Sequence, residues 1–300
     1  MTSSDTSWKQ KFALIAKDRT HGASVIVEAA ADALMSLEVA DIKDGSLKSA
    51  LRELYFAQSA MAPVARFVSD LRHCLNNPTD KTFDNCKDVI SSWKYSLQHS
   101  NSKFNNHLLE TPPDQKARVA LFSYSSTTTS AFQALADNNL FYEIAVAESN
   151  PGGEGKHAYD ELRNAGHQVC YYPDPHFYDL VSYVKVDALV LGCDALDNQY
   201  FINKIGSGSL AELAHANKVR VELWTSSLKF LPPPVGTSCL KWEKRYTFPE
   251  GCGSKEEKAE YPLFGSGLLE FVDYVRCENG LLTVPRFLQD NSGVEPLDLP

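Results

Sequence analysis

Polar residues directly follow a predicted buried strand in the middle of the chain. Residues 186–191 are almost all apolar, which is typical of a parallel strand covered on both faces. Asp194 follows this strand, and Asn203 and Lys204 precede the glycine- and serine-rich start of a helix. Ligands of open α/β sheets bind at the carboxyl ends of strands and at helix amino termini. A carboxylate there can act as a general base or hold a sugar hydroxyl, and the structural alternative is capping of a turn.

A second polar cluster follows an earlier predicted strand at residues 119–122. Seven of the eight residues from 123 to 130 are serine or threonine, and a helical pattern follows them. Hydroxyls and free amides at a helix amino terminus favour an anion such as phosphate. N-capping is an equal alternative, because serine and threonine are preferred there for structural reasons. The candidate phosphate ligands are Ser125, Ser126 and Thr127.

Two lysines, Lys204 and Lys229, can add positive charge to the same edge of the sheet. Cys193 lies next to Asp194, but adjacent residues of a strand point to opposite faces, so we expect this cysteine in the core. None of the eight histidines forms a metal-binding spacing, and the glycines near residue 153 do not match a dinucleotide fingerprint. The sequence therefore predicts neither a metal nor another cofactor.

The elements around these residues change character near residue 112. Residues 1–112 have helical periodicity, with Pro63 inside one apolar segment, where we expect a kink or two separate helices. Thr111, Pro112 and Pro113 form the best boundary, and strands then alternate with helices of about ten residues from 113 onwards. The prediction is an α/β protein with a helical domain at 1–112 and a parallel-sheet domain at 113–300.

Composition excludes several functional classes. The formal net charge of −9 and the pI near 5.4 argue against a broad nucleic-acid interface. No apolar run is long enough for a membrane span, and the first residues lack a signal-peptide core, so we expect a cytoplasmic protein without a membrane partner. The seven cysteines are scattered and odd in number, which favours free thiols.

Several stretches resemble the translation initiation factor 2B alpha/beta/delta family, whose relatives include methylthioribose-1-phosphate isomerase and ribose-1,5-bisphosphate isomerase. The most specific stretch reads GCDAL, FINKIGSGSLAELAHANKV, VRVELW and SSLKF, within residues 192–230. The segments AESNPGGEGKHAYDELRNAGHQV and DRTHGAS resemble the family's E-[ST]-R-P and R-G-A segments. The resemblance implies a helical amino-terminal domain and a Rossmann-like domain shared with ribose-5-phosphate isomerase and CoA transferases. It also implies a homodimer formed through the Rossmann-like domain.

The resemblance assigns roles to individual residues. In the isomerases, an aspartate and a cysteine carry the aldose-to-ketose conversion, and arginines hold phosphate. Asp194 matches the aspartate, Asn203 and Lys204 match an N-K pair that lines the sugar, and Lys229 matches a lysine near the phosphate.

Other positions depart from the family pattern. Tyr124 occupies the position of the cysteine, His21 replaces the arginine of R-G-A, and Asn150 replaces the arginine of E-[ST]-R-P. Gly22 and Ala23 keep the rest of the R-G-A segment and are counted among the ligand-binding candidates. Loss of the thiol removes a proton-transferring group, and loss of guanidinium groups removes bidentate phosphate recognition.

Three functions fit this pattern. The leading hypothesis is a dimeric binding or regulatory protein that holds a phosphorylated sugar or nucleotide in a degenerate isomerase site. The second is an active aldose-ketose isomerase, with Asp194 as acid and base and Tyr124 or a nearby hydroxyl in place of the thiol. The third is a subunit of the exchange factor that recycles initiation factor 2, which copurification with other subunits would support.

Overall fold

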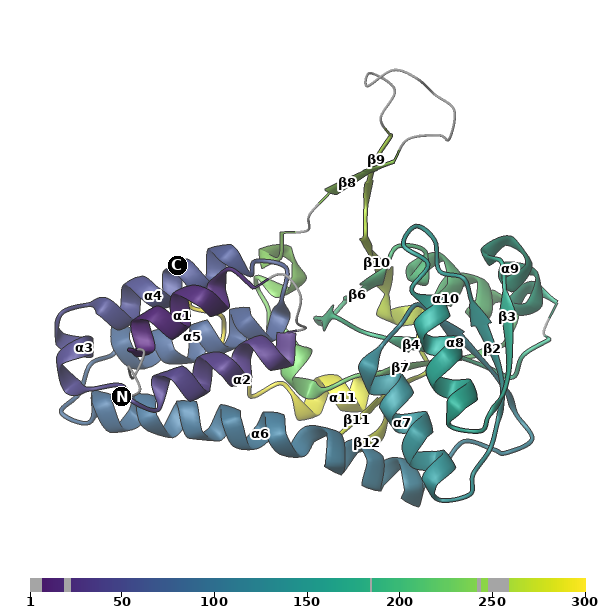
Figure 1. The fold of residues 1–300 in the computed structure, drawn as a ribbon, viewed down its shortest axis with the longest axis horizontal. Helices are drawn as coiled ribbons and strands as arrows, with labels where there is room; N and C mark the ends of the chain where they lie inside the picture. The colour runs from purple at the N-terminus through teal and green to yellow at the C-terminus, as the bar shows by residue number, and fades with distance from the viewer. Residues whose placement is uncertain (1–6, 19–22, 184, 242–243, 248–258) are drawn as a thin grey trace, which may run out of the picture. The chain divides into compact units, whose positions relative to one another are not determined.

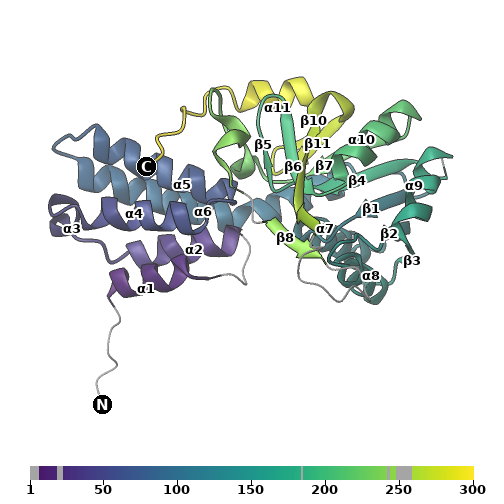
Figure 2. The ribbon, with the colours of Figure 1, turned by 90° about the horizontal axis from the view of Figure 1, so that it is seen from above.

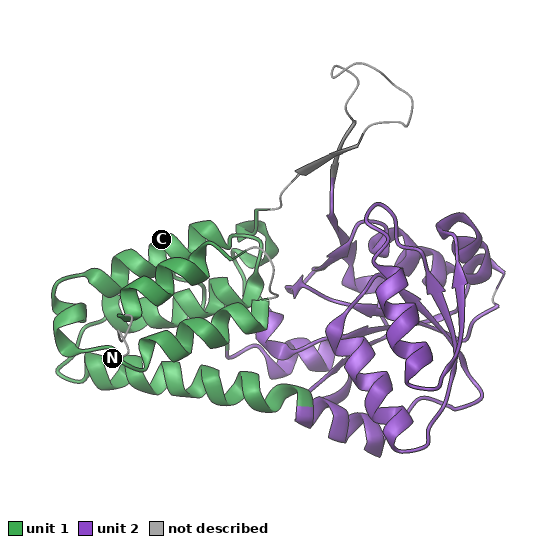
Figure 3. Cartoon of the chain, viewed as in Figure 1, with its two compact units in different colours: residues 1–101, 231–241, 294–300 green, residues 102–230, 242–293 purple. Residues whose placement is uncertain are grey.

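The computed structural model describes residues 7–18, 23–183, 185–241, 244–247 and 259–300 (Figures 1 and 2). The chain forms two compact units (Figure 3). Unit 1 comprises Met1–Asn101, Leu231–Lys241 and Val294–Pro300, and unit 2 comprises Ser102–Phe230 and Trp242–Gly293. This division differs from the predicted boundary at residue 112, because the last turns of the final amino-terminal helix pack in the core of unit 2.

Unit 1 is built from helices, and all of them except the short α3 bury apolar residues. They are α1 (Trp8–Ala16), α2 (Ala23–Leu34), α3 (Val39–Lys43), α4 (Ser46–Ala57), α5 (Ala62–Asn76) and α6 (Thr82–Glu110), which continues into unit 2 from Ser102. The segment around Pro63 is two helices, with the proline in the first turn of α5, where its missing N–H leaves no bond unmade. Phe104 and Leu108 of α6 belong to the core of unit 2.

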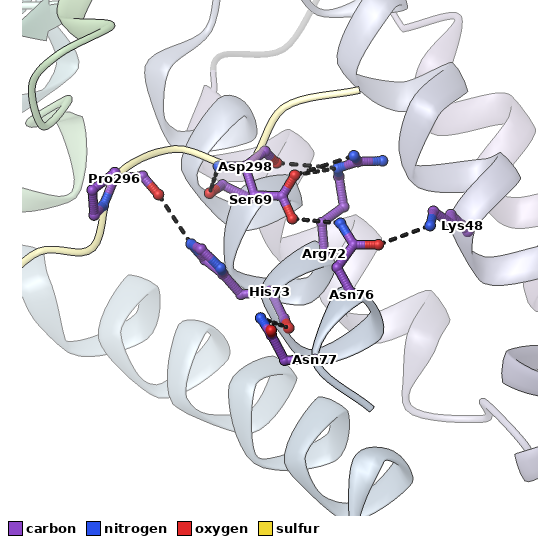
Figure 4. Close-up of polar contacts among 8 residues, drawn as sticks. All are labelled: Lys48, Ser69, Arg72, His73, Asn76, Asn77, Pro296 and Asp298. Atoms are coloured by element: carbon purple, nitrogen blue, oxygen red, sulfur yellow. Dashed lines mark hydrogen bonds and ion pairs between the residues drawn. The ribbon is translucent and has the colours of Figure 1, made fainter. Parts of the chain in front are cut away.

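The last residues of the chain are anchored on α5 of unit 1 (Figure 4). The Arg72 guanidinium donates to the Asp298 carboxylate at 3.1 Å and, through Nε, to the Asp298 carbonyl oxygen at 3.1 Å. Asn76 Nδ2 donates to the other carboxylate oxygen at 2.6 Å, and the Asp298 N–H donates to Ser69 Oγ at 2.7 Å. Backbone and side chain of one aspartate therefore fix residues 294–300 to unit 1.

Unit 2 contains a seven-stranded sheet with the order β12-β11-β7-β4-β1-β2-β3. All neighbouring pairs are parallel except the β11–β12 hairpin. The strands are β1 (Arg118–Phe122), β2 (Glu143–Ala147), β3 (Gln168–Tyr172), β4 (Ala188–Gly192), β7 (Arg220–Trp224), β11 (Tyr274–Cys277) and β12 (Gly280–Thr283). The predicted alternation of strands and helices is confirmed.

Helices connect the parallel strands of unit 2 as crossovers. They are α7 (Ser126–Asp137), α8 (Gly155–Asn164), α9 (Asp174–Ser182) and α10 (Ser207–Ala216), whereas α11 (Val284–Asp290) follows β12. The α7 helix packs against α8, and α9 packs against α10. From β1 the chain moves outward through β2 to β3, and then it returns to β4 on the other side of β1. Right-handed crossovers therefore place the two helix pairs on opposite faces of the sheet.

Shorter sheets, which the sequence did not predict, complete unit 2. β6 (Tyr200–Lys204) lies between β5 (Ala195–Leu196) and β10 (Phe264–Leu268), and β8 (Lys244–Thr247) pairs with β9 (Ala259–Pro262). The glycines at the start of α10 allow close packing on β10, because a Cβ at Gly208 would lie 2.4 Å from the Ser266 carbonyl oxygen. Gly267 is constrained in the same way, because a Cβ at this position would lie 2.3 Å from the Phe201 ring.

None of the described helices is long and apolar enough to cross a membrane. Six of the seven cysteines lie in the described part of the chain and are free thiols, as predicted. Cys193 is buried in the core, also as predicted, and burial raises the pKa of its thiol to about 12.

Candidate functional site

The topological switch point of the sheet lies between β1 and β4. These strands are neighbours, with Phe122 opposite Leu191, and the chain leaves them toward opposite edges of the sheet. Loops that diverge in this way open a crevice at the carboxyl ends of the strands. The loop after β1 carries the hydroxyl-rich turn, and the segment after β4 carries Asp194. The fold therefore brings both predicted clusters to the edge where ligands bind in this architecture.

Gly192, the last residue of β4, lies between two of the candidate side chains. A Cβ at this position would lie 2.9 Å from Ser125 Oγ and 3.8 Å from Asn203 Oδ1. The turn after β1, the end of β4 and strand β6 thus meet around a single point. Asn203 is held there by a hydrogen bond from its Nδ2 to Ser207 Oγ at 3.1 Å. Only glycine allows this approach, which explains why the apolar run of β4 ends in this residue.

The turn after β1 contains hydroxyls that cap helix α7 and backbone amides that have no described partner. Ser125 is the N-cap of α7, and its Oγ accepts from the Thr128 N–H at 3.4 Å. The hydroxyls of Thr128 and Thr129 donate to the Ser125 carbonyl oxygen at 2.9 and 3.2 Å. The backbone N–H groups of Ser126 and Thr127 donate to no acceptor in the described part of the chain. Both alternatives for the turn therefore apply: some hydroxyls cap the helix, and two amides are available to an anion.

Asp194 presents a carboxyl group with no hydrogen bond or ion pair to any residue that the structure describes, while its N–H donates to the Ile202 carbonyl oxygen at 2.8 Å. The residue is half-buried, and burial raises the pKa of its carboxyl group. The positive charge of Lys229 opposes this shift. Lys229 is held nearby because its Nζ donates to the Cys193 carbonyl oxygen at 2.7 Å. A carboxyl group with a raised pKa and no internal partner is suited to exchange a proton or to accept a hydroxyl.

Lys204 is not a free cation. It is 3% exposed, and its Nζ donates to Glu154 Oε1 at 2.7 Å, to Glu154 Oε2 at 2.9 Å, and to the Pro151 carbonyl oxygen. Glu154 lies in the loop between β2 and α8, 50 residues before Lys204. The sequence predicted the lysine but not its partner, since nothing in a local pattern links these positions.

The loop that carries Glu154 is fixed by a chain of hydrogen bonds. Ser149 is fully buried, and its Oγ accepts from the Ser123 N–H at 2.7 Å. The N–H groups of Ser149 and Asn150 donate to the two carboxylate oxygens of Asp174, each at 2.6 Å. Ser149 and Asp174 thus connect the ends of β1, β2 and β3, a positioning role that the sequence analysis missed. An acidic residue in the first turn of a helix was the available signal, but it is common and unspecific.

Tyr124, at the family's cysteine position, is directed at α8. Its hydroxyl donates to Glu161 Oε1 at 3.1 Å, and its ring lies edge-on to His157. Burial and the negative charge of Glu161 raise the pKa of this phenol. A phenol whose pKa is raised is protonated at neutral pH, so this arrangement is unfavourable for a general base.

Two of the predicted ligand positions, Gly22 and Ala23, do not belong to unit 2. Gly22, like His21, falls outside the described residues, and Ala23 begins α2 in unit 1. Within the described part of the chain, no group of three or more His, Cys, Asp or Glu side chains has the arrangement of a metal site. A separate cavity of about 410 Å³ in unit 2, lined by Asn198, Gln199, residues 268–270 and Val272 among others, shares no residue with the site at the switch point.

The mostly parallel sheet, with polar residues at its switch point, defines the chain as a Rossmann-like α/β protein. More particularly, the chain belongs to the initiation factor 2 subunit family, whose sequence model matches residues 19–242.

Similar proteins fall into two functional groups. Ribose 1,5-bisphosphate isomerase from Methanocaldococcus jannaschii is 22% identical over 288 residues, which cover 91% of each chain. The enzyme of the same name from Archaeoglobus fulgidus is 26% identical over 53% of this chain and 51% of its own. Among solved structures, the translation initiation factor eIF-2B of Pyrococcus horikoshii OT3 has a TM-score of 0.75 and 18% identity, covering 94% of this chain and 98% of its own. The 5-methylthioribose 1-phosphate isomerase of the same organism has a TM-score of 0.65 and 17% identity, covering 96% and 88%. These structures share the fold.

Proposed function

We propose that this protein binds a phosphorylated sugar or nucleotide at the switch point of unit 2 and acts as a binding or regulatory protein. The observation that carries the proposal is the unpaired Asp194 carboxyl group, two residues after Gly192, which packs against Ser125, the N-cap of α7. The cysteine position of this site holds Tyr124. The chain thus keeps groups that hold a ligand and lacks the thiol that the resemblance assigns to catalysis.

Each group has a chemical role in this proposal. The free N–H groups of Ser126 and Thr127 bind the phosphate, because the helix dipole and unpaired donors both favour an anion. The Asp194 carboxylate accepts a hydroxyl of the sugar, and Asn203 Oδ1 faces the same point beside Gly192. Lys229 supplies a positive charge close to the carboxylate.

Isothermal titration calorimetry with ribose 5-phosphate, ribose 1,5-bisphosphate and AMP tests this proposal. We expect heat from at least one compound, and a loss of affinity of about tenfold or more on Asp194→Asn, since a hydrogen bond to a charged group is lost. Asp160→Asn on the exposed face of α8 is a matched control. The absence of heat from every compound, or equal affinity of the Asp194→Asn protein, would contradict the proposal.

An active aldose-ketose isomerase is the second candidate, and the raised pKa of Asp194 specifically favours it. A carboxyl group with a pKa nearer neutrality can both accept and return a proton, as isomerisation requires. Conversion of ribose 1,5-bisphosphate or methylthioribose 1-phosphate to the ketose, followed by NMR and abolished by Asp194→Asn, would support this candidate. The Tyr124→Phe variant should then keep its activity, because the phenol is turned toward Glu161.

We further propose that the protein is a cytoplasmic homodimer and does not bind nucleic acid or membranes directly. One solved relative is described as a tetrameric eIF2B-beta2-delta2 complex from Chaetomium thermophilum, so assembly with other subunits is the competing arrangement. Analytical ultracentrifugation of the isolated protein tests the dimer. A monomer that sediments as a complex only with other translation-factor subunits would support the exchange-factor role instead.

A further inference from the structure

The ion pair between Lys204 and Glu154 lies at the edge of the sheet that carries the proposed site. It has no role in the ligand binding proposed above. The Lys204 side chain is 4% exposed and the Glu154 side chain 35%, and both carboxylate oxygens lie within 2.9 Å of the lysine Nζ. A carboxylate with two oxygens on one ammonium group is an anion that accepts the same donors that a bound phosphate group would need there.

The lysine reaches this carboxylate across the ligand edge of the sheet. Asn203, the preceding residue, lies beside Gly192 at the end of β4, whereas Glu154 follows β2. Strand β1 lies between β4 and β2, so the Lys204 side chain spans the end of β1, where the hydroxyl-rich turn begins. The ion pair therefore lies at the same edge of the sheet as the turn that begins α7, the phosphate subsite of the proposed function.

The loop around Glu154 is shaped for this contact. Gly152 has a φ of +120°, and a Cβ there would lie 2.7 Å from Glu154 Oε1. Gly155 begins α8 against the end of β2, where a Cβ would lie 1.7 Å from the Ala147 carbonyl oxygen. Both positions require glycine, so the backbone permits the carboxylate to fold back onto the lysine.

We propose that Glu154 is a specificity-determining residue that acts as an internal anion. This inference rests on the proposed function. The Glu154 carboxylate binds the Lys204 ammonium group, and a ligand phosphate must displace this carboxylate before the lysine can contribute to binding. A free anion such as inorganic phosphate gains too little from this exchange, whereas a phosphorylated sugar adds contacts to Asp194 and Asn203. Glu154 thereby restricts the site to ligands that carry both a phosphate and a polyhydroxylated part.

Calorimetric titration of the full chain with ribose 5-phosphate, inorganic phosphate and ribose tests the inference in Glu154→Gln. Glutamine keeps the shape of the side chain and removes the competing charge. We expect ribose 5-phosphate to bind about tenfold tighter and inorganic phosphate to become measurable, with no change for ribose. Asp160→Asn is the matched control, because it removes one carboxylate from an exposed pair with Lys156 on the same helix and should leave all three affinities unchanged.

A second variant, Glu154→Asp, keeps the charge but shortens its reach by one methylene. We expect its affinity for ribose 5-phosphate to fall between wild type and Glu154→Gln, and this variant carries the test if the glutamine variant does not fold. Weaker binding of ribose 5-phosphate by Glu154→Gln would overturn the inference and make Glu154 a ligand for sugar hydroxyls. Equal binding in all variants would overturn it while leaving the proposed function intact. No binding by any variant, wild type included, would refute both.

Discussion

The unpaired carboxyl group of Asp194 should lower the stability of the folded protein. Burial raises the pKa of this group, which means that the folded protein holds the proton more tightly than the unfolded chain does. We therefore predict that Asp194→Asn stabilises the folded protein at neutral pH. The amide keeps the size of the side chain, and it removes a charge that no described residue pairs with.

The magnitude follows from the local contacts. An unsatisfied, partly buried polar or charged group costs about 1–3 kcal/mol, and the nearby charge of Lys229 offsets part of this cost. We expect Asp194→Asn to increase the free energy of unfolding by about 1–2 kcal/mol, which raises the melting temperature by about 2–8 °C for a unit of this size.

The effect should depend on pH with a defined sign. Because the folded pKa is raised, the wild-type protein loses stability as the pH rises through the folded pKa, and it regains this stability as the pH falls toward the unfolded value of about 3.9. The amide has no such titration. The advantage of Asp194→Asn should thus be largest above the folded pKa and shrink as the solution is acidified.

Differential scanning calorimetry of both proteins across this pH range is the assay, with Asp160→Asn as a control whose exposed carboxylate pairs with Lys156. The control should differ from wild type by less than about 0.5 kcal/mol. A lower melting temperature for Asp194→Asn at neutral pH, or an advantage that does not change with pH, would refute the reasoning.

Three further predictions concern stability. Glu222 and Arg276 are both 1% exposed, and Arg276 Nε lies 3.6 Å from the Glu222 carboxylate. Glu222→Gln should therefore lower the free energy of unfolding by about 3–5 kcal/mol, because it leaves a buried charge unpaired, and this loss is measured as faster amide exchange in β7 and β11. A loss below about 1 kcal/mol would contradict this prediction. Asp298→Ala should release residues 294–300 from Arg72 and accelerate their amide hydrogen exchange about tenfold, whereas an unchanged exchange rate would mean that the contact contributes little. Ser125→Ala should cost about 1 kcal/mol in urea unfolding through loss of the α7 N-cap, and Ser126→Ala, one residue later, should be neutral; equal stabilities of the two would argue against the capping role.

Local pattern was sufficient for much of the fold. Alternating apolar runs and helical periodicity predicted the strands β1, β2, β3, β4 and β7 and the helices between them, because strand and helix repeats are properties of neighbouring residues. The same logic located Asp194 after β4 and the hydroxyl-rich turn after β1, since the carboxyl ends of adjacent parallel strands share one edge. It also placed Cys193 in the core, because adjacent strand residues face opposite ways.

Other features depend on pairings between distant segments, which no local repeat encodes. The sequence indicated Lys204 as a source of positive charge at this edge, but the loop after β2 supplies its partner Glu154, and this pairing follows from the strand order. Strand β6 was not predicted, because of its two partners β5 is only two residues long and β10 lies some 60 residues later. The tail joins unit 1 through Asp298 and Arg72, 226 residues apart. The sequence by itself determined which elements form and which side chains end the strands, whereas tertiary structure decided which of those charges are already neutralised, because electrostatic partners are chosen by proximity in space.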